Sequence, residues 1–385
     1  MSCLLRACRE AAGDRQTFDL RYADGVVAAR GALEPERGDQ VFDLGGAFVS
    51  PGLIDAHVHL GLGGPPEAAA RASFAAGLTA VRDLGGMYEA DPEDPLGALG
   101  PPDARHARHA SGPPNARGAG AAEDMWDRPL RVVSAGRALT RKGGYGAFLG
   151  VAVSDRAGLL AAAQAEIGRG AATLKVIVSG VVDFASATVG PPHFDAEDLR
   201  ELVAVARQAG VPVAAHANGP EAIGIAVAAG VDSVEHGILI SEAALLAMAA
   251  AGTRWVPTLT PLYNLRADPR WPRLAEIFER HLEVVARGRE LGVILVAGSD
   301  AGSPGVPHVS LHTEISLLRH AGLSPPELRR AATGAAAELL RFGDGYGRLE
   351  VGACTDLVWF AEDPFETRGG AGVRALGVMM GPGRN

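Results

Sequence analysis

The sequence contains too little cysteine for a disulfide-stabilised protein. Its three cysteines, Cys3, Cys8 and Cys354, are too few for a disulfide framework, and their spacing is not that of a zinc-binding pair. We therefore expect a protein of a reducing compartment, the cytoplasm.

The sequence also lacks the patterns that mark membrane and nucleic-acid binding. No uncharged apolar run approaches the roughly 18 residues of a membrane span, and Arg6 and Arg9 interrupt the short apolar run at the N-terminus, unlike a signal peptide. The formal net charge is −9, and no stretch is dense in lysine or arginine. The expected partner is a small-molecule substrate, with no nucleic acid and no membrane. The sequence leaves open whether the chain forms a homo-oligomer.

What the sequence does contain is a repeated pattern of helix end, glycine and β-branched run. It occurs five times, in AAGLTAVRDL, QAGVPVAAHA, AAGVDSVEHG, AAGTRWVPTL and ELGVILVAGSD. Glycine suits the left-handed position that ends a helix, and the apolar run suits a strand buried on both faces. Helical stretches are expected at 196–209, 220–229, 241–251 and 273–291. This alternation predicts a parallel sheet with crossover helices.

Eight apolar runs are candidate strands of that sheet. They are Gly52–Val58, Leu78–Asp83, Leu130–Ala135, Thr173–Val178, Val211–Ala217, Val231–His236, Trp255–Leu259 and Val293–Ser299. Eight strands fit a closed (β/α)₈ barrel, and 385 residues with 47% hydrophobic content can bury such a core. The alternative is an open doubly wound sheet, which usually binds its ligand at a switch point and not at many strand ends.

The two ends of the chain differ from the middle. Residues before about Pro51 and after about Arg341 contain short apolar runs separated by Asp-Gly and Gly-Gly turns. We expect residues 1–50 and 342–385 to form one discontinuous β-sandwich domain beside a barrel at 51–341. Residues 89–128 are rich in proline, glycine and arginine without periodicity, which predicts a surface loop, or alternatively a lid. His106 and His109 within it are not expected to bind a metal.

The most specific motif is PGLIDAHVHL, where one residue separates His57 from His59. Residues i and i+2 of a strand point to the same face, and in a barrel that face is the interior. Buried imidazoles need a hydrogen-bond partner or a metal ion, so the motif predicts two metal ligands. The alternative is a pair of hydrogen-bonded core histidines with Asp55 beside them.

A lysine lies in the middle of another predicted strand, Lys175 in AATLKVIVSG. Burying an unpaired ammonium is costly, so this group should shift its pKa, pair or be modified. A lowered pKa would let the neutral amine take up CO₂, and the resulting carbamate is a carboxylate that can bridge two cations. The alternative is a lysine whose tip reaches solvent at the barrel mouth or pairs with Asp83.

Three further candidates end predicted strands, at the edge where barrel chemistry takes place. His216 in VPVAAHANG and His236 in VDSVEHG precede small-residue loops, and Asp300 follows the eighth run in VILVAGSDAGSP. The alternatives are core histidines and, for Asp300, a helix cap or turn residue.

Together the candidates would form a two-metal centre of His57, His59, Lys175, His216, His236 and Asp300. Four neutral imidazoles, one bridging anion and one carboxylate suit zinc, with manganese, iron or cobalt as alternatives, because the set is too rich in nitrogen for magnesium or calcium. Glu235, Asp83 and Arg82 are polar groups at strand ends that we expect to support the ligands or the fold.

These motifs resemble those of the amidohydrolase superfamily. The resemblance rests on PGLIDAHVHL, the lysine in LKVIVSG, AHANGPEAIGIAVAAGVDSVEHG, AGSDAG and the closing GRLEVGACTDLVWF, and it runs from about Phe42 to Asp363. Within the superfamily it is closest to the imidazolonepropionase-like and Xaa-Pro or Xaa-Arg dipeptidase-like branch.

The resemblance implies a role for each candidate ligand. His57 and His59 would bind the more buried ion, His216 and His236 the more exposed one, and carbamylated Lys175 would bridge the two. Asp300 would bind the buried ion and shuttle the proton.

The resemblance also implies groups on the substrate side. His308 and His312, after the eighth strand, are such candidates, and RALTRKGGYG would be a loop over the site. Many relatives have Gly-Gly-His in that loop where this chain has Tyr145, and SGVVDF replaces the commoner Ser-Gly-Gly after the lysine. Tyr145 could donate a hydrogen bond to a carbonyl oxygen or pack within the loop. The expected catalytic residues are therefore Asp300, Tyr145 and His308.

The expected activity is metal-dependent hydrolysis. A hydroxide that bridges the metal ions would attack the carbonyl carbon of a small cyclic amide, an N-acyl amino acid or a dipeptide, while Asp300 accepts the proton and returns it to the leaving group. A lactone or ester is an alternative substrate of the same centre. Two competing hypotheses are a mononuclear deaminase, against which Lys175 argues, and a barrel that has lost catalysis. Specificity would depend on loops 89–128, 141–150 and 261–272.

Overall fold

The computed structural model describes residues 2–86, 130–343, 345–367 and 373–380. The expected loop or lid at 89–128, with His106 and His109, lies outside these residues.

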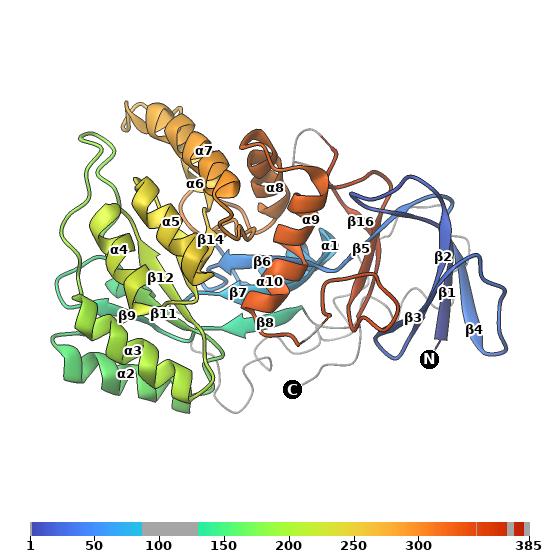
Figure 1. The fold of residues 1–385 in the computed structure, drawn as a ribbon, viewed down its shortest axis with the longest axis horizontal. Coiled ribbons are helices and arrows are strands. Elements are labelled where there is room, and N and C mark those ends of the chain that lie inside the picture. Colours follow the sequence, from blue (N-terminus) through green and yellow to red (C-terminus); the bar gives the residue numbers. More distant parts are fainter. Residues whose placement is uncertain (1, 87–129, 344, 368–372, 381–385) are drawn as a thin grey trace.

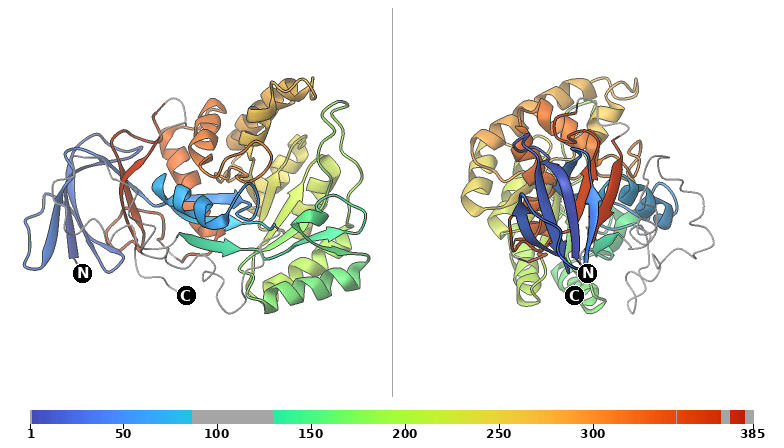
Figure 2. Two further views of the ribbon diagram at one scale, coloured as in Figure 1. Left: turned by 180° about the vertical axis from the view of Figure 1, so that it is seen from behind. Right: turned by 90° about the vertical axis from the view of Figure 1, so that its right-hand side faces the viewer.

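Strands from both ends of the chain pair in one sheet, which lies at one end of the molecule (Figures 1 and 2). Its seven described strands are β1 (Ser2–Glu10), β2 (Phe18–Ala23), β3 (Val26–Gly31), β4 (Asp39–Asp43), β5 (Phe48–Pro51), β15 (Leu357–Phe360) and β16 (Ala375–Met379). The central pairing is antiparallel, between β5 and β15, and it joins the two halves. Leu5, Leu20 and Trp359 pack in a common apolar cluster there. Strands from both ends of the chain therefore share one sheet.

The middle of the chain forms two parallel sheets. The first contains β6 (Leu53–Val58), β7 (Leu78–Asp83) and β8 (Arg131–Ser134), and the second contains β10 (Gly150–Val153), β9 (Ala138–Arg141), β11 (Leu174–Ile177), β12 (Val213–Ala217), β13 (Ser233–His236) and β14 (Arg254–Val256) in this order. Every residue of β6, β7, β11, β12 and β13 is buried. Seven of the eight predicted strands are present, and β9 and β10 were not predicted.

The eighth predicted strand, Val293–Ser299, is instead an irregular segment. It contacts both parallel sheets, since Val296 N donates to Trp255 O at 2.9 Å and Ala56 N donates to Ala297 O at 3.0 Å. Within these residues only Leu295 forms a β-bridge, with Trp255. The segment therefore lies between β14 and β6 without a regular ladder.

The helices follow the strands and cover the parallel sheets from outside (Figure 1). Among the described residues they are α1 (Pro66–Ala75), α2 (Arg156–Gly168), α3 (Ala196–Gln208), α4 (Pro220–Ala229), α5 (Glu242–Ala251), α6 (Leu259–Leu265), α7 (Leu274–Glu290), α8 (Leu311–His320), α9 (Pro325–Ala332) and α10 (Gly334–Leu339). The four predicted helices correspond to α3, α4, α5 and α7. No helix in the described part of the chain has the length and apolar character needed to cross a membrane.

Gly298 has no space for a side chain, which predicts a stability effect. A Cβ at this position would lie 2.4 Å from Cγ1 of Val256 and 3.0 Å from the backbone nitrogen of His57. Because backbone cannot move aside cheaply, we expect Gly298→Ala to lower the free energy of unfolding by about 1–3 kcal/mol, as measured by urea denaturation.

Gly224→Ala in α4 is the matched control. A Cβ there would meet no atom within 4 Å, and alanine favours a helix over glycine by about 0.5–1 kcal/mol. The control should therefore be at least as stable as the wild type, and equal stability of the two variants would contradict the close approach of the segment to β6.

Candidate metal centre

Two imidazoles at the end of β6 are held by their Nδ1 atoms. His57 Nδ1 lies 2.8 Å from Glu235 Oε2, and His59 Nδ1 lies 2.5 Å from the carbonyl oxygen of Gly85. The Nε2 atoms of both rings are therefore left without these partners, and both lie near Oδ1 of Asp300. A histidine whose remote nitrogen donates to a carboxylate or carbonyl is typical of metal ligands, because the hydrogen bond fixes the tautomer and the ring orientation.

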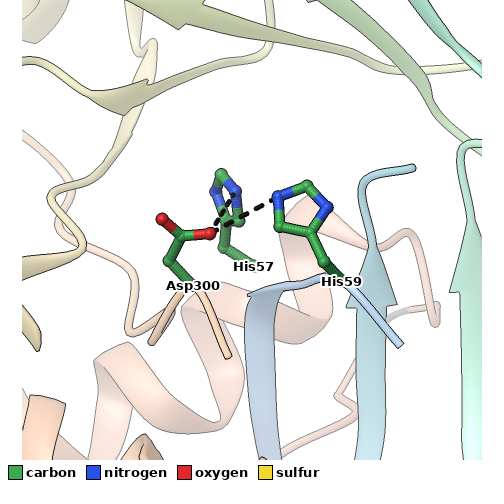
Figure 3. A group of neighbouring side chains, drawn as sticks. All are labelled: His57, His59 and Asp300. Carbon is green, nitrogen blue, oxygen red and sulfur yellow. Dashed lines mark ion pairs between the residues drawn. The ribbon is translucent and has the colours of Figure 1, made fainter. Parts of the chain in front are cut away.

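Asp300 completes a group of three side chains, drawn in Figure 3. Its Oδ1 lies 3.6 Å from His57 Nε2 and 3.4 Å from His59 Nε2. One donor atom from each of the three residues lies within 4.8 Å of the others. Asp300 has a left-handed backbone (φ 57°), which is uncommon for a residue other than glycine, and such strain is concentrated at functional sites.

Asp55 holds the segment that carries Asp300. Its carboxylate accepts hydrogen bonds from the backbone nitrogen and the hydroxyl of Ser299, at 2.9 Å and 2.5 Å. Burial raises the pKa of Asp55 to about 6. Asp55 is thus committed to Ser299 and positions Asp300, although the sequence alone could only place it beside the histidines.

His216 and His236 lie next to this group on adjacent strands. Their ring centroids are 4.5 Å apart, and the ring of His236 is 4.9 Å from that of His57. His236 Nδ1 lies 2.7 Å from the hydroxyl of Thr258, and the backbones of His236 (φ 65°) and Thr258 (φ 45°) are both left-handed. Because strand alternation would turn His236 away from the face that Glu235 occupies, this kink brings its ring to the other imidazoles.

Lys175 on β11 is buried, with 1% of its surface exposed, and its Nζ has no hydrogen-bond partner. The alternatives in which the amine reaches solvent or pairs with Asp83 are therefore wrong. Desolvation lowers the pKa of Lys175 to about 8, against the opposing charges of Glu235 and Asp300. A neutral amine is thus accessible near physiological pH.

Burial also controls the protonation of the imidazoles. Desolvation lowers the pKa of His216 to about 3 and the pKa values of His57 and His236 well below the usual range. Burial acts in the same direction on His59, but its contacts with Asp300 outweigh it and raise the pKa. Neutral imidazole is the form that binds a metal ion.

The residues fit a metal centre. His57 Nε2 is buried without a hydrogen-bond partner, and such an atom loses the solvation it has in water. A cation between His57, His59 and Asp300 would satisfy it and would separate the carboxylate from the rings. The donor set of nitrogen and one carboxylate favours zinc over calcium or magnesium.

Arg82 and Glu235 form a buried ion pair beneath the centre. Arg82 donates to Glu235 Oε1 at 2.7 Å and to the hydroxyl of Ser233 at 3.0 Å. The other oxygen of Glu235 is the one that contacts His57. Arg82 neutralises the charge of Glu235, and Glu235 orients the ring of His57. These contacts agree with the supporting role expected for the two strand-end groups.

A pocket opens over these side chains. Its volume, including the open mouth, is about 740 Å³, and His59, Lys175, His216, His236 and Asp300 lie among its lining residues. Tyr145 also lines it, with its ring 5.4 Å from that of His216. Burial, and secondarily the charge of Asp300, raises the pKa of Tyr145 to about 12, so its hydroxyl keeps its proton.

The structure does not bring His308 and His312 into this pocket. His308 Nε2 lies 2.7 Å from the carbonyl oxygen of Leu62. His312 is buried with its Nε2 2.9 Å from the carbonyl oxygen of Ala76 and its ring near Phe360. Neither is among the described lining residues. His308 lies before α8 and His312 in its first turn, and each side chain bonds to a backbone carbonyl elsewhere.

Two of the three predicted specificity loops contribute to the lining. Tyr145 comes from loop 141–150, and Leu262 from 261–272. The segment SGVVDF after β11, whose sequence departs from that of many relatives, was not among the predicted specificity loops. Its residues Val181, Val182 and Phe184 line the pocket. The position of this segment in the sequence could have indicated its role, because residues that follow the carboxyl end of a strand lie at the active face of such folds.

Several known proteins resemble this chain in sequence or fold. A model of the amidohydrolase family matches residues 128–379. An uncharacterized protein of Mycobacterium tuberculosis is 32% identical over 371 residues, covering 94% of this chain and 89% of its own. An imidazolonepropionase of Pseudomonas putida is 28% identical over 363 residues, covering 88% and 85%. The crystal structure of a prolidase bound to N-methylphosphonate-L-proline shares the fold, with a TM-score of 0.81 at 23% identity over 99% of both chains.

The family match spans more than half of the chain and includes β11 to β13, which carry Lys175, His216 and His236. The relatives belong to the branch that the sequence motifs predict, so the resemblance is confirmed. This chain belongs to the amidohydrolase family and is a hydrolase that acts on carbon–nitrogen bonds.

Proposed function

We propose that the protein hydrolyses the amide or peptide bond of a small cyclic amide, an N-acyl amino acid or a dipeptide at a centre of two divalent metal ions. The observation that carries this proposal is the position of Lys175. Its amine is buried without a partner beside four imidazoles and a carboxylate, and its pKa is lowered to about 8. A lysine in this position is suited to become a carbamate that two cations share.

The proposal includes a (β/α)₈ barrel as the scaffold. Segment 293–299, although irregular, would take the place of the eighth strand, since it bonds to both β14 and β6. On the opposite side, Ala172 N donates to Ser134 O at 2.9 Å, which links β8 to the chain entering β11. Residues 1–50 and 342–385 would form the accompanying β-sandwich domain around the barrel at 51–341.

Each proposed ligand has its support in the geometry. His57, His59 and Asp300 would hold the more buried ion, and His216 and His236 the more exposed one, with carbamylated Lys175 between them. Zinc is the preferred metal, with manganese, iron or cobalt as alternatives. Bound there, such ions would supply an activated water at neutral pH and a Lewis acid for the carbonyl oxygen.

The chain's own residues supply proton transfer and orientation. Asp300 is the one carboxylate in the described lining of the pocket, so it would accept a proton from the attacking water and return it to the leaving nitrogen. Tyr145 keeps its proton because its pKa is about 12, and its hydroxyl would donate to the carbonyl oxygen as charge develops. The apolar walls would exclude bulk water during these transfers.

A single-ion deaminase is the second candidate, and one observation favours it. Among the described histidine, cysteine, aspartate and glutamate residues, only His57, His59 and Asp300 form a group of three whose donor atoms all lie within 4.8 Å of one another. The buried amine of Lys175 would have no role in that centre, which is why we prefer two ions. Metal content distinguishes the two candidates: the deaminase would hold one equivalent of metal per chain, and the preferred hydrolase two.

Asp300→Asn tests proton transfer. The amide keeps the size of the carboxylate but cannot accept the proton, so kcat is expected to fall about 10²–10⁴-fold. The assay uses whichever dipeptide, N-acyl amino acid or cyclic amide the zinc-loaded wild type turns over, with metal content measured in parallel. Asp14→Asn, at an exposed position of the terminal sheet region, should match the wild type. Unchanged kcat in the Asp300 variant would refute the role.

Lys175→Met tests the bridging carbamate. After reconstitution with zinc and bicarbonate, the wild type should hold two equivalents of zinc per chain, and the variant about one or fewer, by elemental analysis. Because the pKa of Lys175 is about 8, the neutral amine becomes scarce below that pH. At a fixed concentration of dissolved CO₂, activation of the apoprotein should slow several-fold between pH 8 and pH 7. Two equivalents of zinc in the variant would contradict the assignment.

Thr258→Val tests the orientation of His236. Valine has a similar shape but cannot bond to Nδ1 of His236, so the affinity for the second ion should fall about 10–100-fold, as measured by competition with a chelator. Thr253→Val is the matched control, since Thr253 is buried and its hydroxyl donates to the carbonyl of Val231 at 3.4 Å, away from the centre. Equal zinc affinities in the two variants would show that the hydroxyl does not position the ring.

A further inference from the structure

The walls of the pocket are apolar above a polar floor. Six side chains from four segments illustrate this: Phe148, Val181, Val182, Phe184, Leu262 and Pro304. Among the described lining residues the charged groups are Lys175 and Asp300, and both belong to the proposed metal centre. The described wall therefore offers no free cation to a substrate.

The mouth of the pocket is apolar as well. Phe148 and Val181 both line it, and each is 50% exposed to solvent. Large apolar side chains that gather on an open rim mark a surface that a ligand covers. The ring of Tyr145 lies 5.7 Å from that of Phe148 in an edge-to-face arrangement, which continues the aromatic surface inward toward His216.

The cationic residues that flank the lining segments are directed elsewhere. The guanidinium of Arg266 lies over the ring of Tyr263, 3.6 Å from its centroid, and also bonds to the carbonyl of that residue. The guanidinium of Arg141 lies over Phe194 at 6.0 Å. Lys142 is exposed and is not among the described lining residues.

In the described lining, a substrate carboxylate would therefore meet no free cation. Asn218 there already bonds to Gly180 and His216, which leaves the hydroxyls of Tyr145 and Ser303 as uncharged donors. Moving an ionised carboxylate out of water costs free energy unless a cation or several donors replace the water. The negative charge of Asp300 on the floor would add repulsion. A neutral aromatic or branched aliphatic group meets no such cost and gains from covering Phe148 and Val181.

We propose that the substrate is a neutral amide with an apolar group on each side of the scissile bond, and that free dipeptides and N-acyl amino acids are poor substrates. This inference rests on the proposed hydrolysis at the metal centre, and it replaces the dipeptides and N-acyl amino acids of that proposal with neutral amides, cyclic or open-chain. The reaction consumes water: the carbonyl carbon gains an oxygen, the carbon–nitrogen bond breaks, and the leaving nitrogen takes up a proton.

A matched pair of compounds tests the substrate class. N-(2-phenylethyl)benzamide and N-benzoyl-phenylalanine differ only in the carboxylate of the latter, and both would release benzoate. With the zinc-loaded full-length enzyme, kcat/KM for the neutral amide should be at least about tenfold higher. Preference for the carboxylate-bearing compound would overturn the inference while leaving the hydrolytic function standing.

A binding measurement distinguishes failure of this inference from failure of the proposed hydrolytic function. Calorimetry on the zinc-loaded wild type measures affinity for two uncleavable ketone analogues of these compounds, in which a methylene group replaces the amide nitrogen, so that Asp300 and its charge stay in place. Tighter binding of the neutral analogue supports the inference even when the wild type cleaves neither amide, in which case the proposed function fails alone. Equal affinities, tighter binding of the carboxylate analogue, or no binding of the neutral analogue at millimolar concentration would overturn the inference.

A positive charge added at the mouth of the pocket tests the substrate preference independently. Val181→Lys places an ammonium on the rim and should lower the preference for the neutral amide at least about fivefold, mainly through a lower KM for N-benzoyl-phenylalanine. Val351→Lys is the control, because Val351 is also an exposed valine (61%) but does not line the pocket, and its preference should equal that of the wild type. An unchanged ratio in the Val181 variant would show that the substrate does not reach this rim.

Discussion

The burial of the Lys175 amine is the constraint on which the site depends. An ammonium in the interior without a partner would destabilise the fold, and here its atom has neither solvent nor a hydrogen bond. The surrounding residues do not neutralise it directly, because Glu235 already pairs with Arg82 and His57. Burial therefore lowers the pKa of Lys175, which makes the neutral amine more accessible. Conversion of the amine to an anion shared by cations would remove the conflict and give the site its chemistry.

The remaining ligands reach Lys175 through local departures from regular strand geometry. His236, Thr258 and Asp300 all have left-handed backbones at the ends of parallel strands or of the segment beside them. For His236, the departure turns inward a side chain that alternation would point away from the face of Glu235. Such strain persists because buried hydrogen bonds fix the same residues or their neighbours, as between Asp55 and Ser299. The site is thus built at some cost in local stability.

Much of the parallel architecture could be predicted from the sequence. The buried runs that became β7 and β11 carry a strong apolar signal, and the glycines after α4 and α5 mark helix ends with left-handed backbones. The six proposed ligands could also be found, because each interrupts or ends an apolar run with a group that is expensive to bury. The prediction of a regular strand at 293–299 was wrong, since apolar content alone does not report the irregular backbone there.

The pocket wall could not be predicted in the same way. Phe184 and Val181 follow β11 in a segment without periodicity, and their convergence with Phe148 depends on backbone turns that are specified by tertiary contacts. His308 and His312 satisfy the spacing expected after the last strand, yet their Nε2 atoms bond to the carbonyls of Leu62 and Ala76. The direction of both side chains, one before α8 and one in its first turn, depends on such tertiary hydrogen bonds, which composition does not encode.

The most direct measurement is anomalous X-ray diffraction at the zinc absorption edge, on crystals of the full-length protein grown with zinc and bicarbonate. We expect two anomalous peaks, one at about 2.0–2.1 Å from Nε2 of both His57 and His59 and one beside His216 and His236, with additional density on Nζ of Lys175 between them. A single peak with an unmodified lysine, or peaks remote from these imidazoles, would contradict the two-ion centre.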